Sequence, residues 1–225
     1  MSVDSVLRES VCRLNIELES LGLVAWTAGN VSERLPDGNS FIIKPSGVRY
    51  ADLTGAMLVV CDLNGNVLEG ELSPSSDTAT HAYIYRKMPE VGGVAHTHSN
   101  YASAWSVIHS PIPCALTAMA DEFGGPIPLG PFALIGSDEI GRGVVETLRE
   151  HRSNAVIMKN HGVFTIGKNG NAALKSAVMC EDVAKTIWIA RTMGNIQEID
   201  QFEIDQLFTR YQNVYGQTNG EKNDA

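Results

Sequence analysis

The tripeptide His96-Thr97-His98 carries the strongest chemical signal in this sequence. It follows the apolar segment 91–95, which is typical of a strand. Side chains alternate between faces along a strand, so imidazoles at positions i and i+2 point the same way and can bind one metal ion. A third imidazole, His161, lies between two β-branched runs and beside Gly162, which permits an unusual backbone. Three imidazoles without a cysteine leave one coordination position open, as catalytic zinc sites do.

Two alternatives to a metal site use the same residues. A His-x-His pair taken alone can be two unrelated surface histidines. A cupin uses such a pair with a later histidine, but it needs a glutamate soon after the pair, and 100–106 contains none. The other histidines have ordinary structural explanations: His81 lies within a predicted helix, His109 beside prolines, and His151 at a helix end that favours partial positive charge.

Three polar segments offer groups that bind an anion. Residues 73–77 reach the start of a predicted helix, where backbone N–H groups and serine hydroxyls can hold a phosphate and direct Asp77 toward the metal. The same serines also suit a simple helix cap. Residues 44–47 add the Lys44 ammonium, and 29–32 add glycine and asparagine amides. Neither of these last two segments matches a Walker loop or a dinucleotide fingerprint, so each is weak evidence by itself.

The elements that position these residues follow from periodicity and turn residues. Apolar residues at 7, 11, 14, 18 and 21 predict an amphipathic helix that ends at Gly22. Cap residues, prolines and glycines predict further helices at 77–88, from Ser99 onward, from Ser137 to about Arg149, and at 171–193. Apolar runs predict strands at 41–44, 57–61, 67–68, 91–98, 155–159 and 163–166, with a hairpin at Asn64-Gly65. Gly29-Asn30 predicts a turn, and the proline- and glycine-rich region 110–130 predicts mainly loop around one short segment.

These elements predict one α/β domain. Helices and strands alternate without a regular βαβ period, which favours a central, mainly antiparallel β-sheet flanked by helices over a Rossmann or barrel fold. A length of 225 residues, 44% of them hydrophobic, suits a single core. We assign the domain to 1–215 and expect the polar residues 216–225 to form a frayed tail.

Charge and cysteine usage exclude several classes of partner and compartment. The chain has 17 basic and 26 acidic residues and a formal charge of −9, so it attracts neither nucleic acid nor an anionic membrane over long range. Four widely spaced cysteines show no disulfide framework and no thiolate zinc motif. The charged N-terminal residues do not fit a signal peptide, and no run of eighteen apolar residues occurs. We therefore expect a cytoplasmic protein.

Taken together, six segments resemble, in order, the motifs of the class II aldolase and L-ribulose-5-phosphate 4-epimerase family. They are Gly29-Asn30-Val31-Ser32, Ile43-Lys44-Pro45-Ser46-Gly47-Val48, Pro74-Ser75-Ser76-Asp77-Thr78, His96-Thr97-His98-Ser99, Asn160-His161-Gly162 and Tyr215-Gly216-Gln217. The resemblance covers nearly the whole chain and implies a fold like that of the adducin head. It implies that His96, His98 and His161 hold a divalent metal, usually zinc, with manganese or cobalt as alternatives. It also implies a place for Asp77 at this site, as a further ligand or an acid/base group.

The resemblance further implies a phosphorylated sugar as substrate and a site shared between chains. Its phosphate-binding residues correspond here to Asn30, Lys44, Gly47, Ser75 and Ser76. The family forms a four-fold homotetramer with active sites between neighbouring subunits. Two acid/base groups, at Asp121 and Tyr215, would then come from an adjacent chain.

Three positions resemble the epimerase branch. Fuculose-phosphate-type aldolases have a glutamate in place of Asp77 and Thr-Pro-Thr-Gly in place of residues 44–47. The stretch 117–121 resembles the epimerases, whose acid/base aspartate falls at Asp121, and Tyr215 matches their second such group. The implied reaction interconverts L-ribulose 5-phosphate and D-xylulose 5-phosphate by cleaving C3–C4 and re-adding the fragments on the opposite aldehyde face.

Two other functions stay open. Between Pro128 and Val144 the chain has nearly aldolase length, and Pro131-Phe132-Ala133 resembles an aldolase pattern. The alternative enzyme is a class II aldolase that cleaves a ketose 1-phosphate to dihydroxyacetone phosphate and an aldehyde. A non-catalytic interaction domain such as the adducin head is a third possibility, but it lacks the metal-binding histidines that this chain has.

Overall fold

A single eight-stranded sheet organises the protein, for which a computed structural model describes residues 3–214. The strand order is β4-β3-β2-β1-β5-β8-β7-β6, and every neighbouring pair is antiparallel except β6 and β7. The strands are β1 (Asn30–Arg34), β2 (Ser40–Ile43), β3 (Val59–Asp62), β4 (Val67–Glu69), β5 (Gly93–Thr97), β6 (Leu129–Gly130), β7 (Ala155–Met158) and β8 (Val163–Gly167). The predicted α/β fold with a mainly antiparallel sheet is therefore confirmed.

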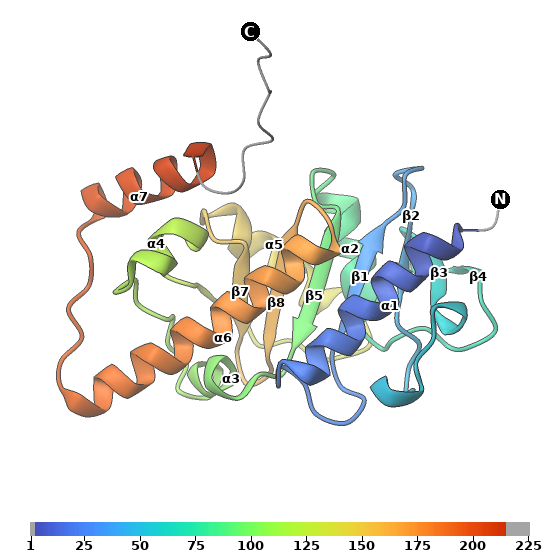
Figure 1. Ribbon diagram of the computed structural model, residues 1–225, viewed down its shortest axis with the longest axis horizontal. Helices are drawn as coiled ribbons and strands as arrows, with labels where there is room; N and C mark the ends of the chain where they lie inside the picture. The colour runs from blue at the N-terminus through green and yellow to red at the C-terminus, as the bar shows by residue number, and fades with distance from the viewer. Residues whose placement is uncertain (1–2, 215–225) are drawn as a thin grey trace, which may run out of the picture.

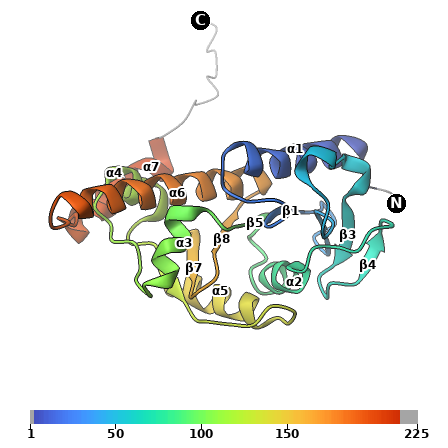
Figure 2. The ribbon, with the colours of Figure 1, turned by 90° about the horizontal axis from the view of Figure 1, so that it is seen from below.

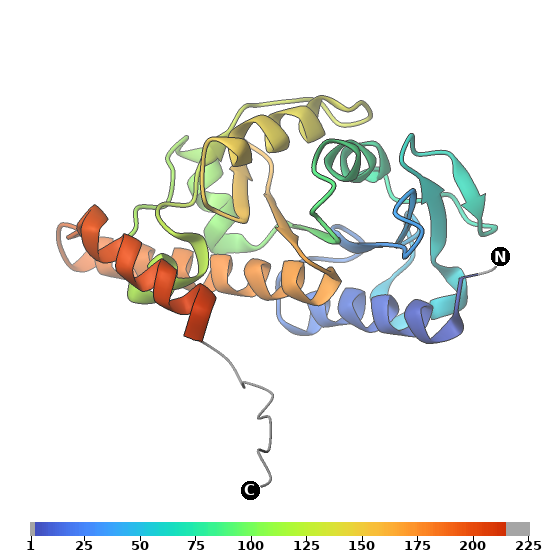
Figure 3. The same ribbon diagram turned by 90° about the horizontal axis from the view of Figure 1, so that it is seen from above.

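Helices cover both faces of the sheet. Figures 2 and 3 show α1 and α6 along one face and α2 and α5 along the other. In Figure 1, α3, α4 and α7 lie toward the β7 side of the molecule. The bounds are α1 (Ser5–Ser20), α2 (Thr78–Lys87), α3 (Asn100–Val107), α4 (Thr117–Phe123), α5 (Glu139–Arg149), α6 (Gly170–Met193) and α7 (Gln201–Val214), with short 3₁₀ turns at Tyr50–Asp52 and Gly55–Met57.

Strand alternation divides the core between the two faces. Val31 and Ala95 pack with Leu14 and Leu18 of α1 and with apolar residues of α6. Val94 and Phe164 belong to the opposite core, which includes residues of α2 and α5. Because residues i and i+2 of a strand share a face, Asn30, Ser32 and His96 lie on the α2 side with Val94. This register brings the polar residues of β1 and β5 under the start of α2.

Two sequence-based expectations were wrong in detail, and one helix was not predicted. Gly29 does adopt a positive φ of 78°, but Asn30 already begins β1 rather than belonging to a turn. The region 110–130 contains α4 and β6, so Asp121 lies on a helix; prolines and glycines around these two short elements hide their periodicity. The helix α7 was not predicted at all, although Ile204, Leu207 and Tyr211 recur at helical spacing.

Two further observations concern the environment of the protein. None of the helices formed by residues 3–214 is long and apolar enough to cross a membrane. All four cysteines are free and buried. The tail 216–225 that the sequence predicts to be frayed lies outside the described residues.

Candidate active site

The three histidines predicted as metal ligands meet at the ends of neighbouring strands. His96 lies in β5, His98 directly follows that strand, and His161 lies in the turn between β7 and β8. One ring nitrogen from each residue lies within 4.8 Å of the other two. Nε2 of His96 is 2.9 Å from Nε2 of His98. The structure therefore brings together three nitrogen donors from segments far apart in the sequence.

Neighbouring groups hold His96 in the orientation that a ligand needs. Its Nδ1 donates to the carbonyl oxygen of Val163 at 2.9 Å, which leaves the Nε2 lone pair facing the other histidines. The His96 ring also stacks on Phe164, with centroids 4.0 Å apart and planes 9° from parallel. Nε2 of His161 is buried and has no hydrogen-bond partner among the described residues. A buried nitrogen left unsatisfied in this way is what a metal ligand presents before its metal is bound.

Burial keeps the three imidazoles neutral near pH 7. It lowers the pKa of His96 to about 3. Burial also lowers the pKa of His98 and of His161 below the ordinary value of 6.5, the latter with help from neighbouring His98. Because only a neutral imidazole binds a metal ion, the cluster is ready to accept one at physiological pH.

Distant contacts support the segment that carries His98. Glu181 in α6 accepts hydrogen bonds from the backbone N–H groups of Tyr101 and Ala102, at 3.0 and 2.8 Å, in the first turn of α3. That helix begins two residues after His98. Sequence reasoning missed this role of Glu181, because nothing local links it to the histidines.

The turn that carries His161 is fixed from both sides. Asn160 has a positive φ of 53°, and its Oδ1 lies 2.7 Å from Nε2 of His109. A Cβ atom at position 162 would lie 2.4 Å from the carbonyl oxygen of Thr97, so only glycine fits between the two strand ends. His109 thus supports the site indirectly, although its position beside prolines suggested no such role.

Asp77 lies directly before α2, next to this cluster. Its Oδ2 accepts a hydrogen bond from Nδ2 of Asn30 at 2.8 Å, and Asn30 pairs with His96 across β1 and β5. Burial raises the pKa of Asp77, but the nearby His96 and His81 and the Asn30 amide outweigh that effect and lower it overall. The side chain of Asp77 is therefore a carboxylate, directed inward rather than capping α2.

Lys44 is a buried cation with weak contacts. Only 1% of its surface is exposed, and it forms no ion pair within the described part of the chain. Nζ lies 3.4 Å from the carbonyl oxygens of Thr27 and Pro45 and 4.9 Å from the ring centre of Tyr50. Burial lowers the pKa of Lys44. A buried ammonium with such weak contacts is well suited to bind an anion.

Backbone hydrogen bonds join the two predicted phosphate-binding loops. Ser75 N–H donates to the Lys44 carbonyl at 3.1 Å, and Ser46 N–H donates to the Ser73 carbonyl at 2.9 Å. Nδ2 of Asn30 also lies 3.0 Å from Oγ of Ser75. Of the other predicted residues, Gly47 has a positive φ of 69° and Ser76 is exposed. The loops of Lys44 and Ser75 thus form one structural unit that is continuous with Asn30 and Asp77.

Of the two predicted acid/base residues, Asp121 lies outside this arrangement within its own chain. Asp121 lies on α4, which packs against α6 and α7. Figures 1 and 2 place α4 beyond β7, on the side away from β1 and α2. Oδ1 of Asp121 is buried and has no partner among the described residues. Tyr215 lies outside the described residues.

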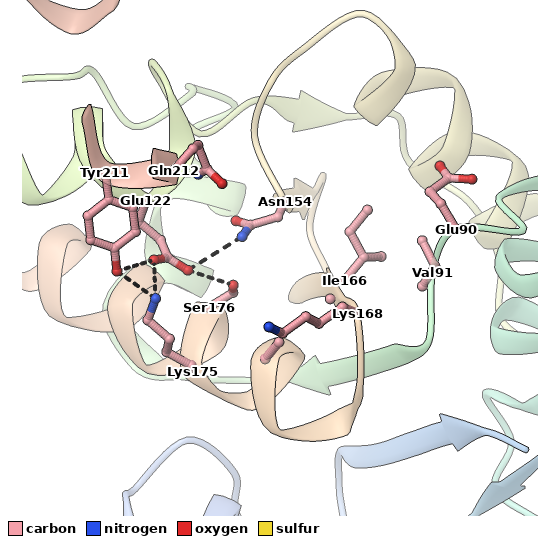
Figure 4. Close-up of a pocket in the computed structure, with 12 residues that line it drawn as sticks. Glu90, Val91, Glu122, Asn154, Ile166, Lys168, Lys175, Ser176, Tyr211 and Gln212 are labelled. Carbon is pink, nitrogen blue, oxygen red and sulfur yellow. Dashed lines mark hydrogen bonds and ion pairs between the residues drawn. The ribbon is translucent and has the colours of Figure 1, made fainter. Parts of the chain in front are cut away.

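A second polar cluster lies elsewhere, beside an open hollow of about 410 Å³ shown in Figure 4. We call it the Glu122 network; its members are Glu122, Asn154, Lys175, Ser176 and Tyr211. Glu122 accepts hydrogen bonds from Lys175 at 2.6 Å, Ser176 at 3.0 Å, Tyr211 at 3.2 Å and Asn154 at 3.4 Å. The hollow also includes Ile166 and Gly167, so it lies at the end of β8 opposite to the histidines.

Comparison with known proteins identifies the family. The sequence model of one protein family, the class II aldolase and adducin N-terminal domain, matches residues 9–188, which is most of the chain. The chain belongs to this family. Class II aldolases use a divalent metal, and the three converging histidines are its candidate ligands.

Solved class II aldolase structures share the fold over nearly their whole length. An L-fuculose 1-phosphate aldolase has a TM-score of 0.87 and 24% identity, with 93% of this chain and 98% of that chain covered. The protein YgbL from Klebsiella pneumoniae, described broadly as an aldolase, epimerase or decarboxylase, has a TM-score of 0.79 and 28% identity, with 92% and 100% covered. An L-fuculose-1-phosphate aldolase from Thermus thermophilus has a TM-score of 0.70 and 26% identity, with 83% and 96% covered.

The residues of this chain fit the metal that the class II aldolase family uses. His96 directs its free nitrogen at the other rings, Nε2 of His161 is unsatisfied within residues 3–214, and all three rings are neutral near pH 7. An all-imidazole donor set suits zinc and similar divalent ions.

Proposed function

We propose that this class II aldolase family member is a metal-dependent L-ribulose-5-phosphate 4-epimerase. It would interconvert L-ribulose 5-phosphate and D-xylulose 5-phosphate. One observation carries the metal-dependent chemistry: the histidines, the Asp77 carboxylate and the buried Lys44 belong to one continuous site, joined through Asn30. The choice of an epimerase over an aldolase rests on Asp77 and residues 44–47, which resemble the epimerase branch. A site of this kind offers a metal to one end of a sugar phosphate and a cation to the other.

The reaction has to break a carbon–carbon bond. The hydrogen on C4 of the substrate is not α to the C2 ketone, so removing it gives no stabilised carbanion. Deprotonation of the C4 hydroxyl with cleavage of C3–C4 instead gives the enediolate of dihydroxyacetone and glycolaldehyde phosphate. A bound Zn²⁺, or Mn²⁺ or Co²⁺ in its place, supplies Lewis-acid stabilisation of the negative charge that develops. Re-addition to the other face of the aldehyde completes the epimerisation.

The residues of the chain have separate tasks in this scheme. The phosphate is held by Lys44, Ser75, Ser76, Asn30 and the backbone at Gly47 while the aldehyde group rotates. Glycolaldehyde phosphate therefore stays in the site until it is attacked on its other face. Asp77, oriented by Asn30 beside the histidines, serves the reacting end of the substrate. Asp121 and Tyr215 exchange protons with the C4 oxygen on opposite faces, with the carboxylate as base and the phenol as acid.

Asp121 and Tyr215 would come from an adjacent chain of a homotetramer. The position of α4 beyond β7, away from the histidines, supports a site completed by a second copy. Oδ1 of Asp121 has no partner within residues 3–214, which supports a role in which it meets a group from outside its own chain. Gel filtration with light scattering should give a tetramer, whereas an active monomer would contradict this arrangement.

Replacing the proposed base tests its role directly. Asp121→Asn should lower kcat by ~10²-fold or more, which is the usual contribution of a general base, while leaving metal content unchanged. The exposed Asp182→Asn on α6 is a matched control that should keep full activity. Normal turnover of the Asp121 variant would remove that residue from the mechanism.

An assay on two substrates separates this proposal from the alternative aldolase. Metal-loaded protein should form D-xylulose 5-phosphate from L-ribulose 5-phosphate. Release of dihydroxyacetone phosphate from a ketose 1-phosphate, without epimerisation, would instead establish the aldolase. The fuculose-phosphate aldolases among the similar structures, together with the aldolase-like Pro131-Phe132-Ala133 segment, favour that second function.

The cysteines and the net charge support a cellular location and a class of partner for this activity. Four free, buried cysteines suit a reducing compartment, which supports a cytoplasmic location. The formal charge of −9 supports a small phosphorylated sugar rather than nucleic acid or a membrane as the partner.

A further inference from the structure

Two pairs of buried polar side chains join β1 to α2. In the first, Nδ2 of Asn30 donates to Oδ2 of Asp77 at 2.8 Å. In the second, Oγ of Ser32 lies 2.7 Å from Nδ1 of His81. Two residues of a strand rise by roughly 6.6 Å, and four residues of a helix by roughly 6 Å. The spacing from Asn30 to Ser32 therefore matches the spacing from Asp77 to His81, so one strand and one helix can form both pairs.

His81 is completely buried and is held from the side of β1. Ser32 Oγ lies 2.7 Å from the hydroxyl of Tyr85 as well as from His81, so the three polar groups form a chain below the sheet face. The ring of His81 meets the edge of Phe164, which also stacks on the ring of His96. His81 therefore shares Phe164 with His96, one of the metal-binding histidines, and it bonds β1 two residues after Asn30, which holds Asp77.

Stability alone does not explain a histidine at this position. Its Nε2 is buried and has no partner among the described residues, which costs free energy that an apolar side chain would not cost. The negative group that acts on His81 is Asp77, one helical turn earlier on the same face of α2. His81 thus shares one face of α2 with Asp77, while its Nε2 bonds no group within residues 3–214.

We propose that His81, held by Ser32 and Tyr85, is a positioning residue that sets the orientation of the Asp77 carboxylate. The Ser32–His81 pair fixes the rotation and depth of α2 against β1, and the Asn30–Asp77 pair then has one geometry available. This inference rests on the proposed function, because it takes Asp77 to be a group that serves the substrate. The sequence suggested only an ordinary structural role for His81, although its i+4 spacing from Asp77 was visible.

A double-mutant cycle tests the proposal. Ser32→Ala removes the hydroxyl that holds His81 and should lower kcat by ~10-fold, as loss of a supporting contact usually does, with KM and zinc content unchanged. In an Asp77→Asn background the same change should cost nothing further, because the carboxylate that it orients is absent. An equal loss of kcat in both backgrounds would mean a general structural role and would overturn the proposal.

A matched control separates positioning from loss of a buried hydroxyl in general. Thr165 Oγ1 in β8 donates to the Ala173 carbonyl of α6 at 2.7 Å and is equally buried, but its hydrogen bond reaches the opposite side of the sheet from α2. Thr165→Val should lower the melting temperature about as much as Ser32→Ala and leave kcat unchanged. Should Ser32→Ala not fold, Tyr85→Phe removes the other hydroxyl of the chain and takes its place in the cycle.

Crystal structures of the metal-free protein give a readout that does not depend on turnover. In the Ser32→Ala or Tyr85→Phe variant, the Asp77 carboxylate should leave Nδ2 of Asn30, whereas in Thr165→Val it should stay. An unmoved Asp77 in the folded Ser32 variant would overturn the positioning role. If wild-type protein turns over neither L-ribulose 5-phosphate nor a ketose 1-phosphate, the proposed function fails, yet this comparison still decides the role of His81.

Discussion

Two polar clusters lie at opposite ends of β8, and they differ in how their groups are satisfied. In the Glu122 network the buried carboxylate accepts four hydrogen bonds and pairs with Lys175 at 2.6 Å. At the histidine end, Nε2 of His161 and Oδ1 of Asn30 find no partner within residues 3–214, and Lys44 contacts carbonyl oxygens rather than an anion. The contrast concerns the Glu122 carboxylate, since Oδ1 of Asn154 in the same network also lacks a partner within residues 3–214. A saturated buried carboxylate contributes to stability, whereas buried groups left unsatisfied are available to a ligand.

Removing a metal ligand is the strongest test of the claim that the histidine end of β8 binds the metal. His161→Ala should abolish bound zinc and lower kcat/KM by ~10³-fold, since the metal supplies several kcal/mol to the transition state. Elemental analysis and the epimerase assay measure the two effects. His151→Ala, which removes an exposed histidine bonded to the Thr147 carbonyl, is the control and should change neither. Full zinc occupancy in the His161 variant would show that the cluster is not the metal site.

Lowering the pH should reduce the stability of the folded, metal-free protein through its buried histidines. Burial lowers the pKa of His81 from 6.5 to about 4 and that of His96 to about 3. Below pH 6.5 the unfolded chain binds protons that the folded chain does not, so stability is full above that pH and falls as the pH drops toward these values. Between pH 7 and 5 the free energy of unfolding of metal-free protein should fall by about 2 kcal/mol per buried histidine.

Urea unfolding at a series of pH values measures this loss. The variant His81→Leu should lose only part of the pH dependence, because it retains His96, His98 and His161, whose pKa values burial also lowers. A free energy of unfolding that stays flat from pH 7 to 5 would show that neither ring is buried as described.

Breaking the Glu122 network should affect stability rather than activity. Glu122→Gln removes the charge that pairs with Lys175, and it should cost about 2 kcal/mol of unfolding free energy because the carboxylate is buried. Zinc content should not change. The exposed pair of Arg152 and Asp205 gives a control, since Asp205→Asn should have a smaller effect. Loss of zinc in the Glu122 variant would show that the Glu122 network is not a purely structural cluster separate from the metal site.

The smallest expected effect comes from removing the buried cation, Lys44. Lys44→Met should raise KM for the sugar phosphate about tenfold, equivalent to about 1.4 kcal/mol, while the unfolding free energy stays level or rises. Steady-state kinetics and urea unfolding give the two values. Lys168→Met at the exposed rim of the other hollow should leave KM unaltered. A destabilised Lys44 variant with normal KM would place this lysine among the structural groups.

Local patterns were enough to predict the histidine end but not what supports it. The i and i+2 spacing of His96 and His98 on a strand, and the glycine beside His161, are visible in the sequence and match the observed convergence. Contacts between distant segments are not visible in that way. Glu181 holds the start of α3 from 79 and 80 positions away, and no local pattern links the two.

The elements that were missed share a physical reason. Both α4 and β6 are short, at 7 and 2 residues, and they form because tertiary packing outweighs the breaking effect of nearby proline and glycine. Asn30 looked like a turn residue because it follows Gly29, but pairing with His96 draws it into β1. Its side chain then reaches Asp77, 47 positions away, which only the sheet register could reveal.

The pairing of β5 with β8 also governs when the metal can enter during folding. His96 and Val163 are 67 positions apart, and the chain between these two strands forms α3, α4, β6, α5 and β7 before the donor nitrogens converge. Long-range pairing of this kind forms late, so no ion can nucleate the chain as zinc does in a zinc finger. A chelator should therefore yield a folded apoprotein with a lower melting temperature, which regains its metal without refolding.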